Sequence, residues 1–217
     1  MCRCHPLEMV GPSKKIISLF ISTLKTEMTN KFRKPDFNII AGALEGLCNF
    51  LYNFTQSSDE DREQSFAIFD YTKQALLNNS EDIARYAMPK AALVLLGKHA
   101  EQFAEFIYTD YKDVFDRIRQ WAQHKNYEMK KLAYCALDSY YKQLAEMLRR
   151  KAKEEPDRCK KIFKYFIQRF YVNLVEEIDL KETVIAIKGY GAFSGVSFLY
   201  FIEHKFFYGK LFIKDKF

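Results

Sequence analysis

The segment Ile185-Ala186-Ile187-Lys188, followed by Gly189-Tyr190-Gly191, places a lysine beside two glycines that could contact a nucleotide phosphate. In a protein kinase, however, the glycine-rich loop precedes the lysine, because two strands and the loop between them must fold over the phosphates in that order. Here the glycines follow the lysine, and the chain has no HRD-type catalytic loop and no DFG triplet to hold magnesium. We therefore predict no kinase active site and no catalytic residue in this chain.

The histidines and serines also lack the neighbours that catalysis needs. His99 and Glu101 have the H-x-E spacing of a zinc deaminase, but the P-C-x-x-C partner motif is missing. Ser194 does not lie in a G-x-S-x-G elbow. We expect His99 and His124 to lie at helix ends, where ring nitrogens can hydrogen-bond main-chain carbonyls.

The five cysteines form no even disulfide framework. Cys2, Cys4 and His5 resemble part of a zinc site, but tetrahedral zinc needs a further ligand at workable spacing, and no CxxC or HxxxH follows. The other three cysteines lie within apolar helical patterns: Cys48, Cys135 and Cys159. We predict no metal and no cofactor, and an intracellular protein with reduced thiols.

One charged segment could bind an anionic partner. The segment from Arg149 to Lys164, here called the basic segment, holds eight cations against three acids. Those eight are the candidate contacts to DNA or a partner: Arg149, Arg150, Lys151, Lys153, Arg158, Lys160, Lys161 and Lys164. They span the predicted end of one helix, a turn and the start of the next, which could present them to a phosphate backbone. Equally, they could form a solvated turn whose lysines complement a helix C-terminus.

The composition predicts a folded, helical chain. Of 217 residues, 48% are hydrophobic and 29% charged, so a packed core is available and disorder is not expected. Glycine (8) and proline (5) are scarce, which favours long helices over a turn-rich β architecture. The net charge of +6 is too modest to identify a partner. No signal sequence and no membrane-length apolar run is present, so we expect a soluble protein without a small-molecule substrate.

Apolar residues recur at helical spacing along nearly the whole chain. Between Asp36 and Phe54 the apolar positions step by three and four, which places one stripe on one helix face, and Asp36 is a predicted N-cap. Short polar breaks separate about eight such helices, as expected for antiparallel neighbours. Pro89, inside a helix expected over residues 82–99, predicts a kink.

Small-apolar pairs indicate a repeat. Four predicted helices carry Ala-Leu or Ala-Ile pairs at separations of 49, 44 and 50 residues, close to the 40–47 residues of HEAT and armadillo units. These pairs are Ala43-Leu44, Ala92-Leu93, Ala136-Leu137 and Ala186-Ile187. The predicted fold is all-α, an α-solenoid of about four HEAT-like helical hairpins that serves as a scaffold. A non-repetitive helical bundle is the alternative.

Six collinear segments carry a more specific resemblance. They are HPLEM (residues 5–9), LKTEMT (24–29), IIAGALEGLCNFLYNFT (39–55), RYAMPKAAL (85–93), MKKLAYCAL (129–137) and AIKGYGAFSG (186–195). In this order they closely resemble the N-terminal HEAT region of the DNA-dependent protein kinase catalytic subunit family, one of the PI3K-related kinases. The resemblance covers residues 5–195.

This resemblance implies a role in double-strand break repair by non-homologous end joining, in the nucleus. In the family, the N-terminal solenoid and the middle solenoid cradle a DNA end delivered by the Ku heterodimer, and the Ser/Thr kinase domain lies far downstream. The resemblance therefore implies a non-catalytic scaffold segment with double-stranded DNA ends and Ku as partners and no membrane. The alternative from another functional class is a generic HEAT-repeat adaptor that binds a partner helix.

The resemblance stops at Gly195. We predict a lead-in over residues 1–12, HEAT-like repeats over 13–195 and a divergent tail over 196–217. This tail has eight aromatics in 22 residues and no helical stripe. We interpret it as a non-native end, from a truncated gene model or from read-through of non-coding sequence. A strand pair or a family-specific insertion is the alternative, since aromatics suit strands.

Overall fold

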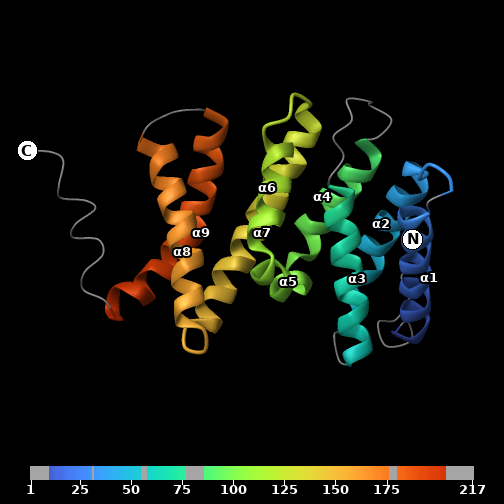
Figure 1. Cartoon of the computed structure of the whole chain (residues 1–217), viewed down its shortest axis with the longest axis horizontal. Coiled ribbons are helices and arrows are strands. Elements are labelled where there is room, and N and C mark those ends of the chain that lie inside the picture. The colour runs from blue at the N-terminus through green and yellow to red at the C-terminus, as the bar shows by residue number, and fades with distance from the viewer. Residues whose placement is uncertain (1–9, 31, 55–57, 77–85, 176–179, 204–217) are drawn as a thin grey trace, which may run out of the picture. The chain divides into compact units, whose positions relative to one another are not determined.

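The computed structural model describes residues 10–30, 32–54, 58–76, 86–175 and 180–203, and over these ranges it contains helices and no strand. Helices pack side by side within each compact part of the chain, which confirms the predicted all-α fold of HEAT-like hairpins (Figure 1). The chain divides into two compact units, residues 1–140 and 141–217. Among the described helices, none combines the length and apolar character that crossing a bilayer requires.

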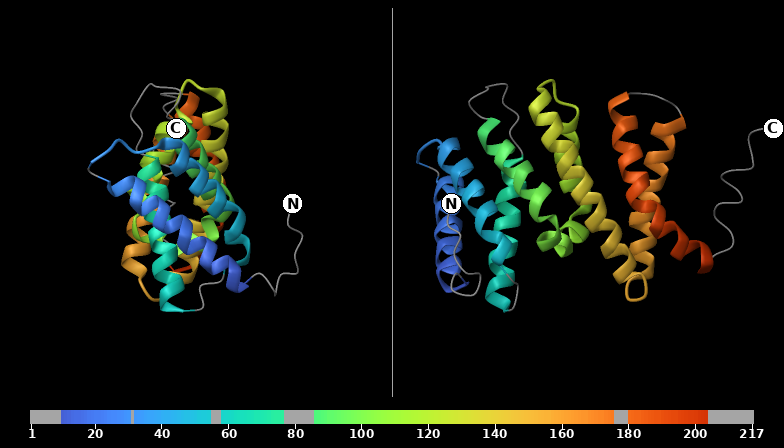
Figure 2. Two further views of the ribbon diagram at one scale, coloured as in Figure 1. Left: turned by 90° about the vertical axis from the view of Figure 1, so that its right-hand side faces the viewer. Right: turned by 180° about the vertical axis from the view of Figure 1, so that it is seen from behind.

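The first unit begins with two hairpins. Its elements are α1 (Val10–Thr29), α2 (Phe37–Phe50), the short 3₁₀ helix η1 (Leu51–Asn53), α3 (Asp59–Ala75), α4 (Ala87–His99), η3 (Ala100–Phe103), α5 (Ala104–Thr109), α6 (Tyr111–Ala122) and the start of α7 (Tyr127–Lys151). Helix α2 packs against both α1 and α4, and α3 packs against the same two helices. Figure 2 shows these helices from two further sides.

Side-chain caps fix where the first helices begin. Asp36 accepts hydrogen bonds from the backbone N–H groups of Asn38 (2.9 Å) and Ile39 (3.3 Å), which confirms the predicted N-cap of α2. Ser58 and Asp61 form a reciprocal capping box at the start of α3. Asp61 is buried and pairs with Lys14 of α1 at 2.7 Å. One capping carboxylate therefore both begins α3 and attaches it to α1.

The alanine-containing pairs predicted from the repeat lie in the core, with one exception. Both members of the pairs in α2, α4 and α7 are buried, with exposed fractions of 4% or less. At Gly97 of α4, the backbone of α7 approaches closely, and Ser139 donates a 2.7 Å hydrogen bond to the Gly97 carbonyl. Small residues thus lie where helices approach closely.

The exception is Ile187, which is 57% exposed, so its predicted place in the core was wrong. The buried stripe of that helix runs through Ile185, Ala186, Gly189 and Phe193. Because each residue turns the helix by about 100°, Ile187 falls on the far side of this stripe.

Pro89 does not interrupt a helix as predicted. Helix α4 begins at Ala87, so Pro89 lies in its first turn, where the missing N–H would have no intrahelical partner. The predicted interior kink is therefore wrong. The expected helical residues 82–85 lie outside the described residues.

In the second unit, α8 (Pro156–Val175) and α9 (Leu180–Glu203) form a hairpin that packs with the end of α7. Tyr141 of α7 meets Phe166, Phe170 and Phe193 edge-on, with ring centroids 5.6 to 6.2 Å apart. All four side chains are almost fully buried. These stripe residues of α7, α8 and α9 therefore form one aromatic cluster.

Helix α9 continues to Glu203, eight residues past Gly195, so the expectation of non-helical structure from Val196 was wrong for these residues. Extending an existing helix costs little, because each added residue gains a hydrogen bond without a new nucleation step. The domain limits at residues 12 and 195 remain predictions.

Candidate nucleic-acid interface

The basic segment folds as a tight corner between α7 and α8. The carbonyl of Lys151 accepts hydrogen bonds from the N–H groups of Glu154 (3.1 Å) and Glu155 (2.8 Å), which ends α7. Pro156 then occupies the first position of α8, and the Glu155 carbonyl accepts the N–H of Cys159 at 3.0 Å. Cys159 is fully buried and anchors the start of α8. The corner therefore has a defined backbone, as its turn composition predicts.

Half of the predicted contact cations are paired with acids. Glu146 accepts hydrogen bonds from Arg149 and Arg150, both at 3.1 Å, and these bonds lower the pKa of its carboxyl, with Arg150 the largest contributor. Glu154 pairs with Lys151 at 3.0 Å, and Glu155 with Arg158 at 3.8 Å. A phosphate would have to compete with these carboxylates for the cations they hold.

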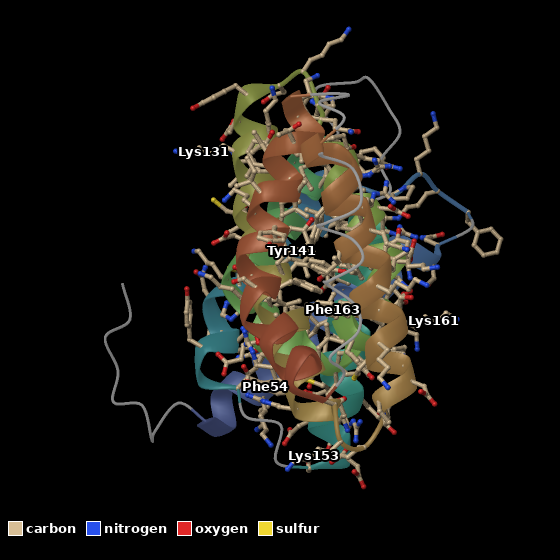
Figure 3. All side chains as sticks on the ribbon, turned by 90° about the vertical axis from the view of Figure 1, so that its left-hand side faces the viewer. Phe54, Lys131, Tyr141, Lys153, Lys161 and Phe163 are labelled. Carbon is tan, nitrogen blue, oxygen red and sulfur yellow. The ribbon has the colours of Figure 1, made fainter. Side chains whose placement is uncertain are left out.

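The remaining cations are Lys153, Lys160, Lys161 and Lys164. Lys153 lies exposed in the turn, and Lys161 and Lys164 are exposed on α8. In Figure 3, Lys153 lies at the turn and Lys161 projects outward from α8, whereas Tyr141 lies among the helices. Neither Lys153 nor Lys161 has an ion pair within the described part of the chain. These two lysines carry the charge most available to an anion.

The arrangement can bind phosphate but cannot read a base sequence. Its donors are lysine and arginine side chains at a helix corner, and no recognition-helix or zinc-finger signature is present in the sequence. Any contact with nucleic acid would therefore be independent of sequence and sensitive to salt.

The kinase-like motif lies in a helix. Lys188, Gly189 and Gly191 are all part of α9, so they form no strand and no loop that could cover a phosphate. Lys188 is half-buried. Ser194, also in α9, donates a 2.8 Å hydrogen bond to the Gly191 carbonyl.

The prediction for the two histidines was half correct. His99 ends α4, and its Nε2 donates to the Cys48 carbonyl at 2.8 Å, as expected. Burial lowers the pKa of His99, although the Cys48 carbonyl and Lys98 act on it as well. His124 follows α6, but its Nδ1 accepts the N–H of Asn126 at 3.1 Å instead of binding a carbonyl.

Metal sites are untested where the sequence suggested one, because Cys2, Cys4 and His5 lie outside the described residues. Over the described ranges, no three histidine, cysteine or acidic side chains form a group that could hold an ion. Cys135 is exposed, whereas Cys48 and Cys159 are buried. Burial raises the pKa of the Cys48 thiol, which keeps it protonated and unreactive.

A second basic corner was not predicted from the sequence. The turn after α6 and the start of α7 carry Lys125, Lys130 and Lys131 around the exposed Tyr127. The adjacent Lys130 and Lys131 of the MKK triplet indicate a concentration of positive charge, but this triplet entered the prediction only as part of the family resemblance.

Comparisons with known proteins identify the family. The family model described as DNA-PKcs, N-terminal, matches residues 1–214. This chain belongs to that family. The DNA-dependent protein kinase catalytic subunit of Xenopus laevis is 40% identical over 192 residues, which are 88% of this chain and 4% of the relative. That of Mus musculus is 39% identical over 193 residues, again 88% and 4%. That of Dictyostelium discoideum is 26% identical over 190 residues, 86% and 4%.

The chain therefore spans about 4% of the length of these relatives, within the region that the family model calls N-terminal. The match reaches residue 214, so it extends beyond Gly195, where the six segments of resemblance stop.

Proposed function

We propose that this chain is a non-catalytic scaffold segment of a nuclear DNA-repair Ser/Thr kinase. It would form part of the solenoid that binds double-stranded DNA ends and the Ku heterodimer in non-homologous end joining. The observation that carries this proposal is the family match over residues 1–214, together with relatives that are DNA-dependent protein kinase catalytic subunits. Within the chain, the basic segment is the proposed DNA contact.

The ion pairs of the basic segment distinguish Arg149 and Arg150 from Lys153 and Lys161. Arg149 and Arg150 already hold Glu146, so a phosphate gains less from them. Lys153 and Lys161 meet no carboxylate in the described residues, and the binding of a phosphate would release only water and counterions. We therefore expect Lys153 and Lys161 to contribute most to duplex binding.

Duplex binding by the whole chain can be measured as a function of salt, using a fluorescent blunt-ended duplex. Each phosphate contact contributes about 0.9 to the slope of log affinity against log salt. Changing Lys153 and Lys161 together to glutamine should therefore lower this slope by about 1.8. The equal charge change at Arg149 and Arg150 should lower it less, because Glu146 partly neutralises them.

A matched control removes the same charge elsewhere. Lys15 and Lys25 are exposed on α1, and their double glutamine variant should keep the wild-type slope. If all three double variants lose affinity equally, the chain responds only to net charge and the basic segment is not the contact. Salt-insensitive capture of an amphipathic peptide, with no duplex binding, would instead support the adaptor alternative.

A further inference from the structure

The corner between α6 and α7, residues Lys125–Lys131, combines an exposed aromatic ring with exposed cations. Tyr127 is 78% exposed, although it is large and partly apolar. Lys125 and Lys131 are exposed and Lys130 is half-buried. Tyr127 and Lys131 are four residues apart in α7 and therefore lie on one face of the helix. In Figure 3, Lys131 extends away from the ribbon.

The backbone of this corner is held in place from inside. Asn126 accepts the N–H of Met129 at 3.1 Å through its side chain, which caps the start of α7. The N–H of Asn126 donates to Nδ1 of His124, whose ring packs 5.2 Å from that of Trp121. Trp121 is buried and donates a 3.0 Å hydrogen bond to the Leu76 carbonyl. Tyr127 therefore projects from a preorganised turn, and ligand binding should cost little conformational entropy in this turn.

The charge of the corner is not neutralised by its own acid. Glu128 is its one acidic residue, and it pairs at 2.6 Å with Lys90 of α4. Lys125, Lys130 and Lys131 have no ion pair among the described residues. Three cations thus surround one exposed ring.

The loop between α1 and α2 also exposes an aromatic ring, but one of its neighbouring cations is held by an acid. Phe32 is fully exposed, and the adjacent Arg33 pairs with the buried Glu27. Lys34 is exposed. An exposed ring therefore occurs in both places, but only the α6–α7 corner adds several unpaired cations within the described residues.

We propose that the α6–α7 corner binds single-stranded nucleic acid, with Tyr127 stacking on a base and Lys125, Lys130 and Lys131 contacting the flanking phosphates. Aromatic rings beside cations are the means by which proteins bind single strands without reading sequence. A duplex offers the ring no such partner, because its bases are already stacked on one another. This site is separate from the proposed duplex contact at the basic segment and goes beyond it.

The test is fluorescence anisotropy of labelled oligo(dT) with the intact chain. Tyr127→Ala should weaken binding by about fivefold or more, because one stacked base contributes that much or more. Tyr127→Phe, which keeps the ring, should stay within about twofold of wild type. The double variant Lys125→Gln, Lys131→Gln should lower the salt slope by about 1.4, since each contact on a single strand contributes about 0.7.

Two controls separate stacking from charge. Phe32→Ala, at the α1–α2 loop where Arg33 is held by Glu27, should bind oligo(dT) like wild type. An abasic strand of equal length should bind wild type and Tyr127→Ala equally, because it has phosphates but no bases. Thermal melts of each variant check folding, and Tyr127 is exposed enough for its replacement to leave the melt unchanged.

Equal binding of oligo(dT) by wild type and Tyr127→Ala would overturn the proposal. So would an equal loss in Phe32→Ala, which would make the effect a property of any exposed ring. The duplex experiment on Lys153 and Lys161 uses other variants and another probe. Either site can therefore fail while the other stands.

Discussion

The two units of the chain stabilise their helices by different chemistry. In the first unit, the buried polar side chains that the structure describes are Glu27, Asp61, Ser65, Thr72 and His99. Several of these join one element to another: Glu27 accepts from the Asp36 N–H, Asp61 from Lys14, and His99 donates to the Cys48 carbonyl. In the second unit, the buried side chains that the structure describes are aliphatic, aromatic, thioether or thiol. Hydrogen bonds and ion pairs therefore help to specify how the helices of the first unit pack. In the second unit, the shapes of the buried apolar side chains do so.

Both units nevertheless share one packing feature, a helical glycine in close contact with a phenylalanine ring. Gly46 of α2 lies under Phe20 of α1, and Gly189 of α9 lies under Phe170 of α8. A methyl group on either glycine would overlap the ring. Phe20 is half-buried, whereas Phe170 is 1% exposed. A glycine-to-alanine substitution should therefore reduce stability more at Gly189, where the buried ring of Phe170 has no room to move.

The largest effect is expected for Gly189→Ala. Phe170 is enclosed by Tyr141, Phe166 and Phe193, so the added methyl must displace the aromatic cluster. Overpacking a filled core costs about 1–3 kcal/mol, and alanine's better helix propensity returns up to about 1 kcal/mol. We expect a net loss of about 1–2 kcal/mol in the free energy of unfolding, measured by urea titration.

Gly191→Ala is the matched control in the same helix, because no atom lies within 4 Å of the added methyl. Without a clash, only helix propensity acts, and stability should rise by up to about 1 kcal/mol. If Gly189→Ala and Gly191→Ala change stability equally, the close approach of Phe170 is not the reason that position 189 requires glycine.

A smaller effect is expected for Gly46→Ala. Phe20 packs tilted against Phe50 at 6.2 Å and is partly open to solvent, so its ring can turn aside. The clash and the gain in propensity should then nearly cancel, leaving a change within about 1 kcal/mol. Gly42→Ala, with open space around the methyl, is the control in α2. A loss at Gly46 as large as that at Gly189 would show that burial of the ring does not decide the cost.

Much of the fold follows from local pattern. The N-cap at Asp36 and the buried Ala-Leu pairs depend on neighbours in sequence, and the sequence predicted them. Ile187 was misplaced because the pattern Ile185-Ala186-Ile187 is apolar on both sides, and only the packing of α8 on α9 selects a face. Pro89 was misjudged because α4 begins at Ala87, later than the expected start at residue 82, which places the proline in the first turn.

The candidate sites were harder to predict, because whether a cation can bind a ligand depends on whether a carboxylate from another part of the fold already holds it. The sequence identified the basic segment but could not show that Glu146 holds two of its arginines. It also gave no sign that Glu128 turns toward Lys90 and leaves Lys131 available. Counts along the chain measure composition, whereas binding depends on which charges remain unpaired in space.

The smallest expected effect concerns His99, the titratable contact of the first unit. Burial lowers its pKa in the folded chain, so the folded state favours the neutral ring that donates to Cys48. The unfolded chain takes up the proton at a pKa of about 6.5. Stability is therefore fully present above about 6.5 and is lost as pH falls below that value toward the folded pKa.

Thermal unfolding over a pH series should show this loss in the wild type and a weaker one in His99→Gln. The glutamine amide can still donate to the carbonyl but does not titrate. Because the second unit has no described buried histidine, the sensitivity should arise in the first unit, where α4 meets α2. If His99→Gln keeps the full wild-type dependence on pH, the polar contact at Cys48 is not the acid-sensitive element.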